Sequence, residues 1–133
     1  MLGEQVSEFN GKITGQRVLD VECPTMETSV AASGNLKGIQ ASETITFMAK
    51  VTSNGILHGV GNGIVMTADG EIATYTGEGI GRMDSTGSIN WRGSIFCKTS
   101  SNGKLAFFNN LVGVFEAQSD VDGNFSDKTW EWK

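Results

Sequence analysis

The chain has 133 residues, 38% hydrophobic and 19% charged, so we expect one globular domain rather than extended disorder. Ten Lys and Arg against 15 Asp and Glu give a net charge of −5. This charge excludes nucleic acids and anionic membranes as main partners, because both require a basic surface.

Residues 1–11 are polar and mixed, and we expect a loose N-terminal arm there. Strand-like runs separated by turn signals follow. In residues 39–51, Ile45, Phe47 and Ala49 alternate with polar side chains, which is the period-two pattern of a half-buried strand. The predicted strands cover residues 12–21, 27–36, 39–51, 56–68, 71–83, 88–99, 104–117 and 125–132.

Short turns join these strands. Asn-Gly at 54–55, Asp-Gly at 69–70 and Ser-Asn-Gly at 101–103 are hairpin signals, and a short helical piece is expected only near residues 105–110. Consecutive strands joined by hairpins form an antiparallel meander. We therefore predict an all-β fold with a single domain over residues 1–133. The prediction is an antiparallel up-and-down barrel of about eight strands, in which closure removes exposed edges, and a two-sheet β-sandwich is the alternative.

Glycine occurs 18 times, roughly twice its usual share of about 7%. Two strands carry alternating glycines: Gly59, Gly61 and Gly63, then Gly77, Gly79 and Gly81. A spacing of two with no following helix excludes a dinucleotide-binding loop. Each triplet lies on one face of its strand, where it either lets a barrel bend or leaves room for a ligand.

A two-residue turn at 69–70 sets the expected register of these two strands. His58 then faces Gly81 and Asn62 faces Gly77, so that glycines lie opposite larger residues. The next turn brings Trp91 beside Gly81, where its ring covers the bare backbone.

The candidate ligand-binding residues follow from this register. We expect His58, Asn62, Tyr75 and Trp91 to line one side of the barrel interior, and Trp130 and Trp132 to lie near a mouth or an interface. For His58 the alternative is a structural hydrogen-bonding role, and for the two C-terminal tryptophans it is core or lid packing.

No catalytic residue is assigned. Acidic residues lie in or beside the predicted strands at Glu27, Glu43, Glu71, Glu78 and Glu116. A carboxylate that points into a barrel has a raised pKa and serves as a general acid or base, whereas most surface carboxylates are solvated or paired with Arg or Lys. With one histidine and no ligand spacing, no metal site and no cofactor are predicted.

Cys23 and Cys97 are the only cysteines, and no secretion signal precedes them. We expect both to be reduced and the protein to be cytoplasmic. No apolar run of 18 residues is present, so we expect no membrane-spanning segment.

Three stretches carry a resemblance to a known family: SGNLKGIQASETITFMAKV, GVGNGIVMTADGEIATYTGEGIGRM and INWRGSIFCKTS. Over residues 12–133 the chain resembles the small barrels related to allene oxide cyclase and the dirigent proteins, above all small prokaryotic members without an assigned function. The resemblance implies an antiparallel barrel with an apolar interior and a tendency to form homo-oligomers. Plant members hold hydrophobic reactive intermediates in a shaped cavity.

The leading functional hypothesis is a barrel that binds a small apolar molecule in its interior. The second is an isomerase or cyclase on a lipid-like substrate, which would place a carboxylate of shifted pKa in the cavity. The third is a structural oligomer with a filled core and no cavity above roughly 300 Å³. The residues leave open whether the chain is an enzyme.

Overall fold

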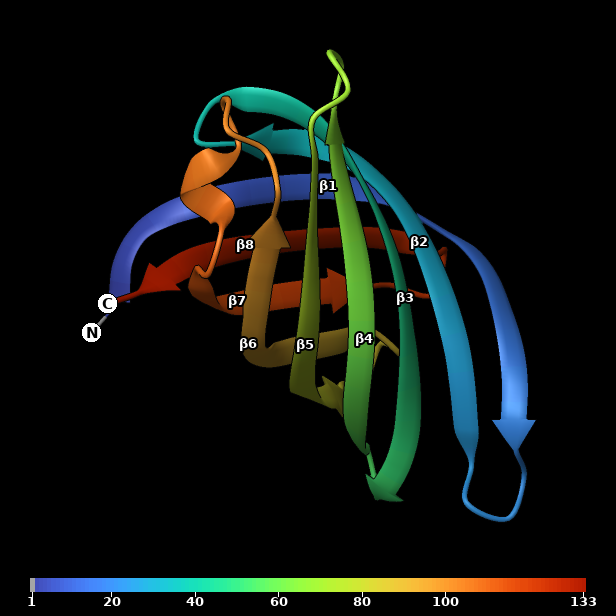
Figure 1. Ribbon diagram of the computed structural model, residues 1–133. Helices are drawn as coiled ribbons and strands as arrows, with labels where there is room; N and C mark the ends of the chain where they lie inside the picture. The colour runs from blue at the N-terminus through green and yellow to red at the C-terminus, as the bar shows by residue number, and fades with distance from the viewer. Residues whose placement is uncertain (1) are drawn as a thin grey trace.

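The computed structural model describes residues 2–133, which form a closed antiparallel barrel of eight strands (Figure 1). Each strand pairs with the next and β8 pairs with β1, so the predicted all-β barrel is confirmed over the sandwich. The elements are β1 (Leu2–Asp20), β2 (Thr25–Leu36), β3 (Ile39–Ser53), β4 (Ile56–Thr67), β5 (Ile72–Met83), β6 (Ile89–Thr99), the 3₁₀ helix η1 (Ala106–Phe108), β7 (Val112–Ser119) and β8 (Asn124–Trp132). Among residues 2–133, no helix has the length and hydropathy that crossing a membrane requires.

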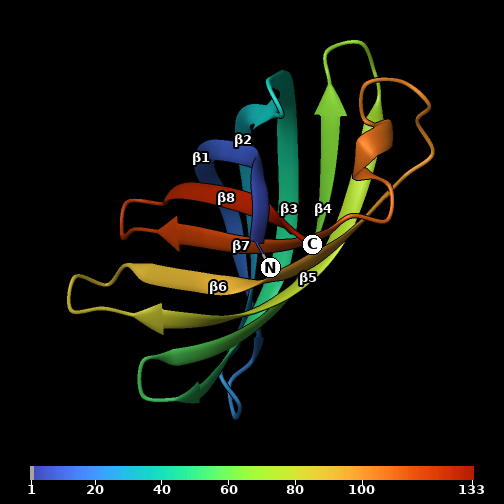
Figure 2. The same cartoon turned by 90° about the vertical axis from the view of Figure 1, so that its left-hand side faces the viewer.

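The prediction of a loose N-terminal arm was wrong. Strand β1 begins at Leu2, which lies opposite Trp132 of β8, and Met1 lies outside the described residues. Val6 and Phe9 are each 1% exposed. These two apolar side chains pack into the core, so the segment joins the sheet between β8 and β2 (Figure 2).

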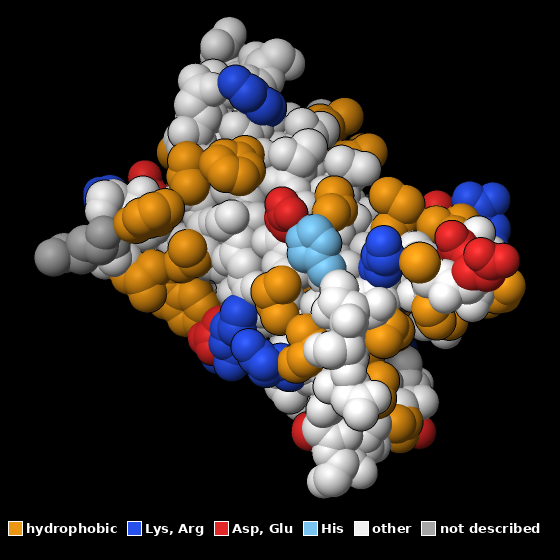
Figure 3. Space-filling view, turned by 90° about the horizontal axis from the view of Figure 1, so that it is seen from below, with side chains coloured by type: hydrophobic (Ala, Val, Ile, Leu, Met, Phe, Trp, Pro, Cys, Tyr) orange, Lys and Arg blue, Asp and Glu red, His pale blue; other side chains and the backbone are white. Residues whose placement is uncertain are grey.

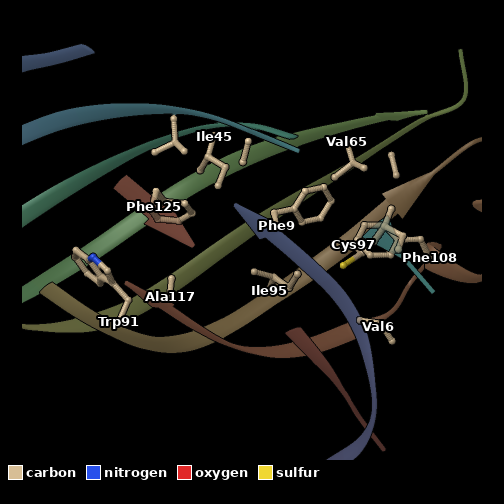
Figure 4. Packing of buried hydrophobic residues seen from close by; sticks show 14 of the residues in the cluster. Val6, Phe9, Ile45, Val65, Trp91, Ile95, Cys97, Phe108, Ala117 and Phe125 are labelled. Carbon is tan, nitrogen blue, oxygen red and sulfur yellow. The ribbon is translucent and has the colours of Figure 1, made fainter. Parts of the chain in front are cut away.

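The inner faces of the strands form one hydrophobic core. In β3, Ile45 and Ala49 are buried and Phe47 is half-buried, as the period-two pattern predicted. Side chains from opposite walls, including Phe9 and Ile95, converge in the interior (Figure 4). The alternation of side chains along each strand therefore places one set inside and the other in solvent.

One end of the barrel is closed by the connection between β6 and β7, residues 100–111. The Ser-Asn-Gly signal at 101–103 is not a tight hairpin: the chain continues through η1, where a short helical piece was expected. Leu105, Phe108 and Leu111 are at most 4% exposed and plug this end. The connection is longer than a tight hairpin because burying three large apolar side chains stabilises the fold more than a short turn would.

Glu71, at the start of β5, anchors this plug. Its carboxylate accepts hydrogen bonds from the backbone N–H groups of Lys104 (3.2 Å) and Leu105 (3.1 Å) and from the hydroxyl of Ser101. These bonds lower the pKa of Glu71, the one from Ser101 most of all. Glu71 thus has a structural role at the barrel rim.

The predicted register of β4 and β5 was wrong by one residue. His58 lies opposite Ile80, and Gly61 lies opposite Gly77. The turn is longer than two residues, because the Thr67 N–H donates to the Glu71 carbonyl oxygen at 3.0 Å and Gly70 takes a positive φ of 90°. Two glycine pairs therefore form on the inner face, Gly59 with Gly79 and Gly61 with Gly77.

Candidate functional site

Two carboxyl groups meet inside the barrel. Glu43 of β3 is 4% exposed and Asp127 of β8 is 8% exposed, although β1 and β2 separate their strands in the sheet. Glu43 shares the inner face of β3 with Ile45, and Asp127 shares that of β8 with Phe125. The alternation that buries the apolar side chains therefore also buries these acids.

The two carboxyls lie close enough for each to change the pKa of the other. Oxygen Oε2 of Glu43 is buried and has no N–H or hydroxyl donor among the described residues. A hydrogen bond between two carboxyls requires a proton on one of them, and a proton on Asp127 would provide such a donor. On Oε1 the Tyr75 hydroxyl donates to Glu43 at 2.5 Å.

Burial is the main cause of the raised pKa values in this cluster. It raises the pKa of Glu43 against the opposing hydrogen bonds from Asp127 and Tyr75. It also raises the pKa of Asp127 well above its ordinary range, helped by the charge of Glu43. The pKa of Tyr75 is raised by burial first and then by the two acids, and burial raises the pKa of Cys97 to about 12. The pair therefore holds one proton at a pH where free carboxyls are ionised.

A partly open cavity of about 90 Å³ adjoins the cluster. The paired glycines Gly61 and Gly77 form part of its wall, where a Cβ atom would lie 2.7 Å from Phe47 or 2.8 Å from Ile95. The rest of the wall is mainly apolar, with Phe9, Ile45, Phe47, Val65, Trp91, Ile95, Phe108, Phe115 and Phe125. Neighbouring atoms thus already occupy the positions that side chains would take, which supports the packing interpretation of the glycine runs, and room for a ligand stays a prediction.

Trp91 borders the cavity from β6. It lies opposite Gly81, as the sequence predicted, and its ring also covers Gly59. Its ring packs edge-on against Phe47 with centroids 5.6 Å apart. Tyr75 and Trp91 are therefore the two predicted ligand-binding residues that line this cavity.

His58 and Asn62 lie on the outer face of β4, so their predicted place inside the barrel was wrong. The one-residue change in register turns the odd-numbered positions of β4 inward. On the surface, His58 Nε2 lies 2.8 Å from Glu78 Oε1, and the two side chains are 40% and 59% exposed. Of this pair, Glu78 borders the cavity and His58 does not.

Trp130 and Trp132 also lie on the outer face, because Asp127 and Thr129 occupy the inner positions of β8. Trp130 is half-buried opposite Val114, and Trp132 is 58% exposed. On β8 the large tryptophans point outward and smaller polar residues point inward. The size of the tryptophan side chains therefore did not indicate which face of the strand is buried.

The sequence analysis included Glu43 among five candidate acids and did not consider Asp127. Extending the alternation of Ile45 and Phe47 by two residues places Glu43 inside the barrel. For Asp127 the signal is ambiguous, since Phe125 favours one face and Trp130 the other.

The outer faces of β3 to β6 carry an exposed apolar surface with few charges. Figure 3, which views the molecule from below, shows hydrophobic side chains near the single histidine, with an acidic side chain directly beside it and basic side chains close by. Large apolar side chains that are 43–54% exposed belong to Met48, Val60, Ile64, Met66, Ile72 and Phe96. Most outward residues between them are Ser, Thr and Asn: Ser42, Thr44, Thr46, Asn62, Thr74, Thr76 and Ser94. We call these thirteen residues the neutral face. Two charged side chains adjoin them, since Glu78 lies opposite Val60 and Ser94, and Lys98 lies opposite Thr74.

A wider groove of about 400 Å³ lies on the outside of β1 and β6 to β8. Its wall is polar, and it contains Arg92 and Glu116, which form an ion pair at 3.2 Å with side chains 61% and 47% exposed. These groups are solvated and paired with each other, so the interior cluster is the stronger candidate site.

No protein-family model matches the chain, and no curated protein sequence does. Solved structures share its fold. A conserved protein of unknown function from Rhodopseudomonas palustris aligns with a TM-score of 0.78 at 11% identity over 98% of this chain and 97% of its own. A protein of unknown function from Clostridium acetobutylicum aligns with a TM-score of 0.81 at 12% identity over 98% of both chains. These similarities establish the barrel fold alone.

Proposed function

We propose that the barrel interior binds a small, mainly apolar molecule and that Glu43 and Asp127 move a proton on it, as in an isomerase. The observation that carries this proposal is the buried pair of carboxyls that share one proton beside an apolar cavity. A site with one proton donor and one acceptor moves a proton from one carbon to another and ends in its starting state.

The cavity volume alone favours the filled-core alternative. About 90 Å³ is below the 300 Å³ or so of typical ligand pockets, and below the roughly 150 Å³ that holds benzene. The substrate is therefore small, and its reacting part enters the cavity while the rest lies in the open side. The two carboxyls argue against a purely structural core. Apolar residues of similar volume often stabilise a protein as much as a buried charged cluster does, or more, so stability alone does not explain these acids.

The chemical roles follow from the hydrogen bonds. Asp127, which holds the proton, is the acid, and Glu43, which accepts from Tyr75, is the base. The Tyr75 hydroxyl orients the Glu43 carboxylate. In an apolar site a carboxylic acid kept neutral at pH 7 can donate a proton or a hydrogen bond, as is known for other isomerases.

A β,γ-unsaturated ketone with six non-hydrogen atoms, pent-4-en-2-one, tests this function. We expect the protein to accelerate its conversion to pent-3-en-2-one, followed by the ultraviolet absorbance of the conjugated product. Glu43→Gln removes the base and should lower the rate about 100-fold or more. Glu116→Gln, on the outer face, is the matched control and should leave the rate unchanged. A wild-type rate equal to that in buffer, or full activity in Glu43→Gln, would contradict the proposal.

We also propose that the chain forms a homo-oligomer through the neutral face. Copies that each carry −5 repel, so contact is most favourable where few charges lie. Cores of homodimer interfaces are apolar and depleted of charged residues, as this face is.

Native mass spectrometry tests the oligomer directly. We expect more than one subunit for the wild type and a monomer for Ile64→Asp, because a charge at the centre of the neutral face loses its hydration on contact. Val21→Asp, in the exposed β1–β2 turn, is the control and should assemble like the wild type. A monomeric wild type would refute the interface, and so would assembly of Ile64→Asp.

Two further expectations are supported in the same way. Cys23 lies in an exposed turn and Cys97 inside the barrel, which favours reduced thiols and a cytoplasmic location. The barrel fold is compatible with the resemblance to allene oxide cyclase and dirigent barrels, and that membership remains a prediction.

A further inference from the structure

The carboxyl pair inside the barrel has no basic side chain beside it to balance its charge. With one proton shared, Glu43 and Asp127 together carry one negative charge. Among the described residues, those that line the adjoining cavity include no Lys, Arg or His. Buried charges in proteins are paired with an opposite charge or a metal ion, because an isolated one is costly. The barrel therefore buries an anion that its own cavity wall does not neutralise.

The basic side chains closest to the pair in the sheet serve the outer face. Lys128 follows Asp127 in β8 and is exposed, since successive side chains of a strand point to opposite faces. It lies opposite Glu116, which also forms the outer ion pair with Arg92. These cations pair with surface carboxylates and leave the interior anion without a counter-charge.

The pair also has unused capacity to accept hydrogen bonds. Oxygen Oε1 of Glu43 accepts from the Tyr75 hydroxyl at 2.5 Å, whereas Oε2 is buried with no N–H or hydroxyl donor within residues 2–133. A single shared proton supplies one donor, and an ionised carboxylate can accept about four hydrogen bonds. A ligand that carries several N–H donors and a positive charge meets both needs of this site.

Aromatic rings adjoin the two acids. Phe9 of β1 lies opposite Asp127 in the β1–β8 pairing, and its ring extends into the interior (Figure 4). Such cross-strand neighbours have Cβ atoms about 4.5–5.5 Å apart. Tyr75 contacts Glu43, and Phe47, Phe115 and Phe125 line the same cavity. Aromatic faces attract cations, so these walls suit a positively charged ligand with a short alkyl group.

The cavity volume limits the size of that ligand. A water molecule takes about 30 Å³ of liquid volume, so about 90 Å³ corresponds to roughly three non-hydrogen atoms. Ethylammonium has this size. Its ammonium group has three N–H donors and no acceptor, and its ethyl group is apolar.

We propose that the cavity binds a small primary alkylammonium ion, whose N–H groups donate to Glu43 and Asp127 and whose alkyl group contacts the aromatic wall. The ion carries one positive charge and the pair one negative charge, so the complex is neutral and keeps the shared proton. This inference goes beyond the proposed function and requires no catalysis. Because the ion occupies the same carboxyls, it competes with the ketone.

A titration of the wild-type protein tests the site. Ethylammonium chloride and ethanol, which have equal numbers of non-hydrogen atoms, are compared by ¹H–¹⁵N NMR, with sodium chloride keeping the ionic strength constant. We expect ethylammonium to shift the amide resonances of Tyr75 and Asp127. It should bind about tenfold or more tightly than ethanol, because hydrogen bonds between charged groups are the stronger ones.

The double variant Glu43→Gln, Asp127→Asn removes the charge and keeps the shape of both side chains. Its affinity for ethylammonium should fall about tenfold or more, with ethanol binding little changed. Glu116→Gln removes one carboxylate from the outer face and should bind ethylammonium like the wild type. If the double variant does not fold, the comparison of ethylammonium with ethanol on the wild type decides.

The outcomes separate this inference from the proposed function. Equal affinities for ethylammonium and ethanol, or an unchanged ethylammonium affinity in the double variant, would overturn the ammonium site. Isomerisation of the ketone by a protein that does not bind ethylammonium leaves the proton-transfer function in place and refutes this inference alone. Binding of ethylammonium without any isomerisation supports the ammonium site and contradicts the proposed function.

Discussion

Gly34→Ala is expected to destabilise the barrel by about 3–5 kcal/mol, a large part of the stability of an ordinary domain. Gly34 of β2 lies opposite Phe9 of β1, where the strands approach closely. A Cβ at position 34 would lie 1.9 Å from the carbonyl oxygen of Glu8. That oxygen belongs to the backbone, so two strands must move apart to relieve the contact.

Urea denaturation followed by circular dichroism measures this effect. Gly15→Ala is the matched control, because no atom lies within 4 Å of a Cβ at position 15 in β1. This substitution should leave the stability unchanged or raise it by about 0.4–1 kcal/mol, because alanine lowers the conformational entropy of the unfolded chain. Equal stabilities of Gly34→Ala and Gly15→Ala would show that β1 and β2 do not approach as closely as the structure indicates.

The stability of the wild-type protein is expected to fall as the pH rises from 5 to 7, by at most about 1.4 kcal/mol per pH unit for one retained proton. Unfolded carboxyls have pKa values near 4, whereas burial raises the pKa of Asp127 well above that value in the folded barrel. The folded state therefore keeps a proton that the unfolded state releases. Each such proton costs about 1.4 kcal/mol per pH unit, so stability is greatest at low pH and declines as pH rises toward the folded pKa.

Other groups do not mask this decline. Side-chain hydrogen bonds from Thr67 and Asn124 lower the pKa values of Asp69 and Asp120, so those contributions are lost only as pH falls below about 4. The raised pKa of Cys97, about 12, keeps its thiol neutral throughout the interval.

Asp127→Asn provides the decisive comparison, because an amide donates to Glu43 as the protonated acid does. We expect urea denaturation to give a smaller decline of stability between pH 5 and pH 7 than in the wild type, because Glu43 is then the one acid of the pair with a raised pKa. Glu116→Gln on the outer face should keep the wild-type slope. A wild-type stability that rises over this interval would mean that the pair is ionised in the barrel.

Local chemistry was sufficient to predict the architecture. Alternation in residues such as Ile45, Phe47 and Ala49 identifies strands, and turn glycines such as Gly55 and Gly70, with φ of 70° and 90°, identify their ends. Both signals depend on neighbours within a few residues. Consecutive strands with short connections then leave little choice except a meander that closes.

The residues of the site could not be predicted in the same way, because strand register and the inward face depend on contacts between residues far apart in the sequence. One extra residue in the turn before Glu71 moved His58 and Asn62 from the predicted interior to the surface, because a shift of one residue reverses the faces of a strand. In β8, where both faces carry large apolar residues, alternation alone could not decide between Trp130 and Asp127.

The sequence by itself determined an antiparallel meander of about eight strands and favoured a barrel over a sandwich, because alternation and turn chemistry are local properties. Only the tertiary structure decided that Glu43, Tyr75 and Asp127 form one cluster, since β3, β5 and β8 are not neighbours in the sheet and meet only across its interior. Barrel closure brings these side chains together and removes them from water. Their raised pKa values, and hence the proposed chemistry, are therefore properties of the closed barrel and not of any one strand.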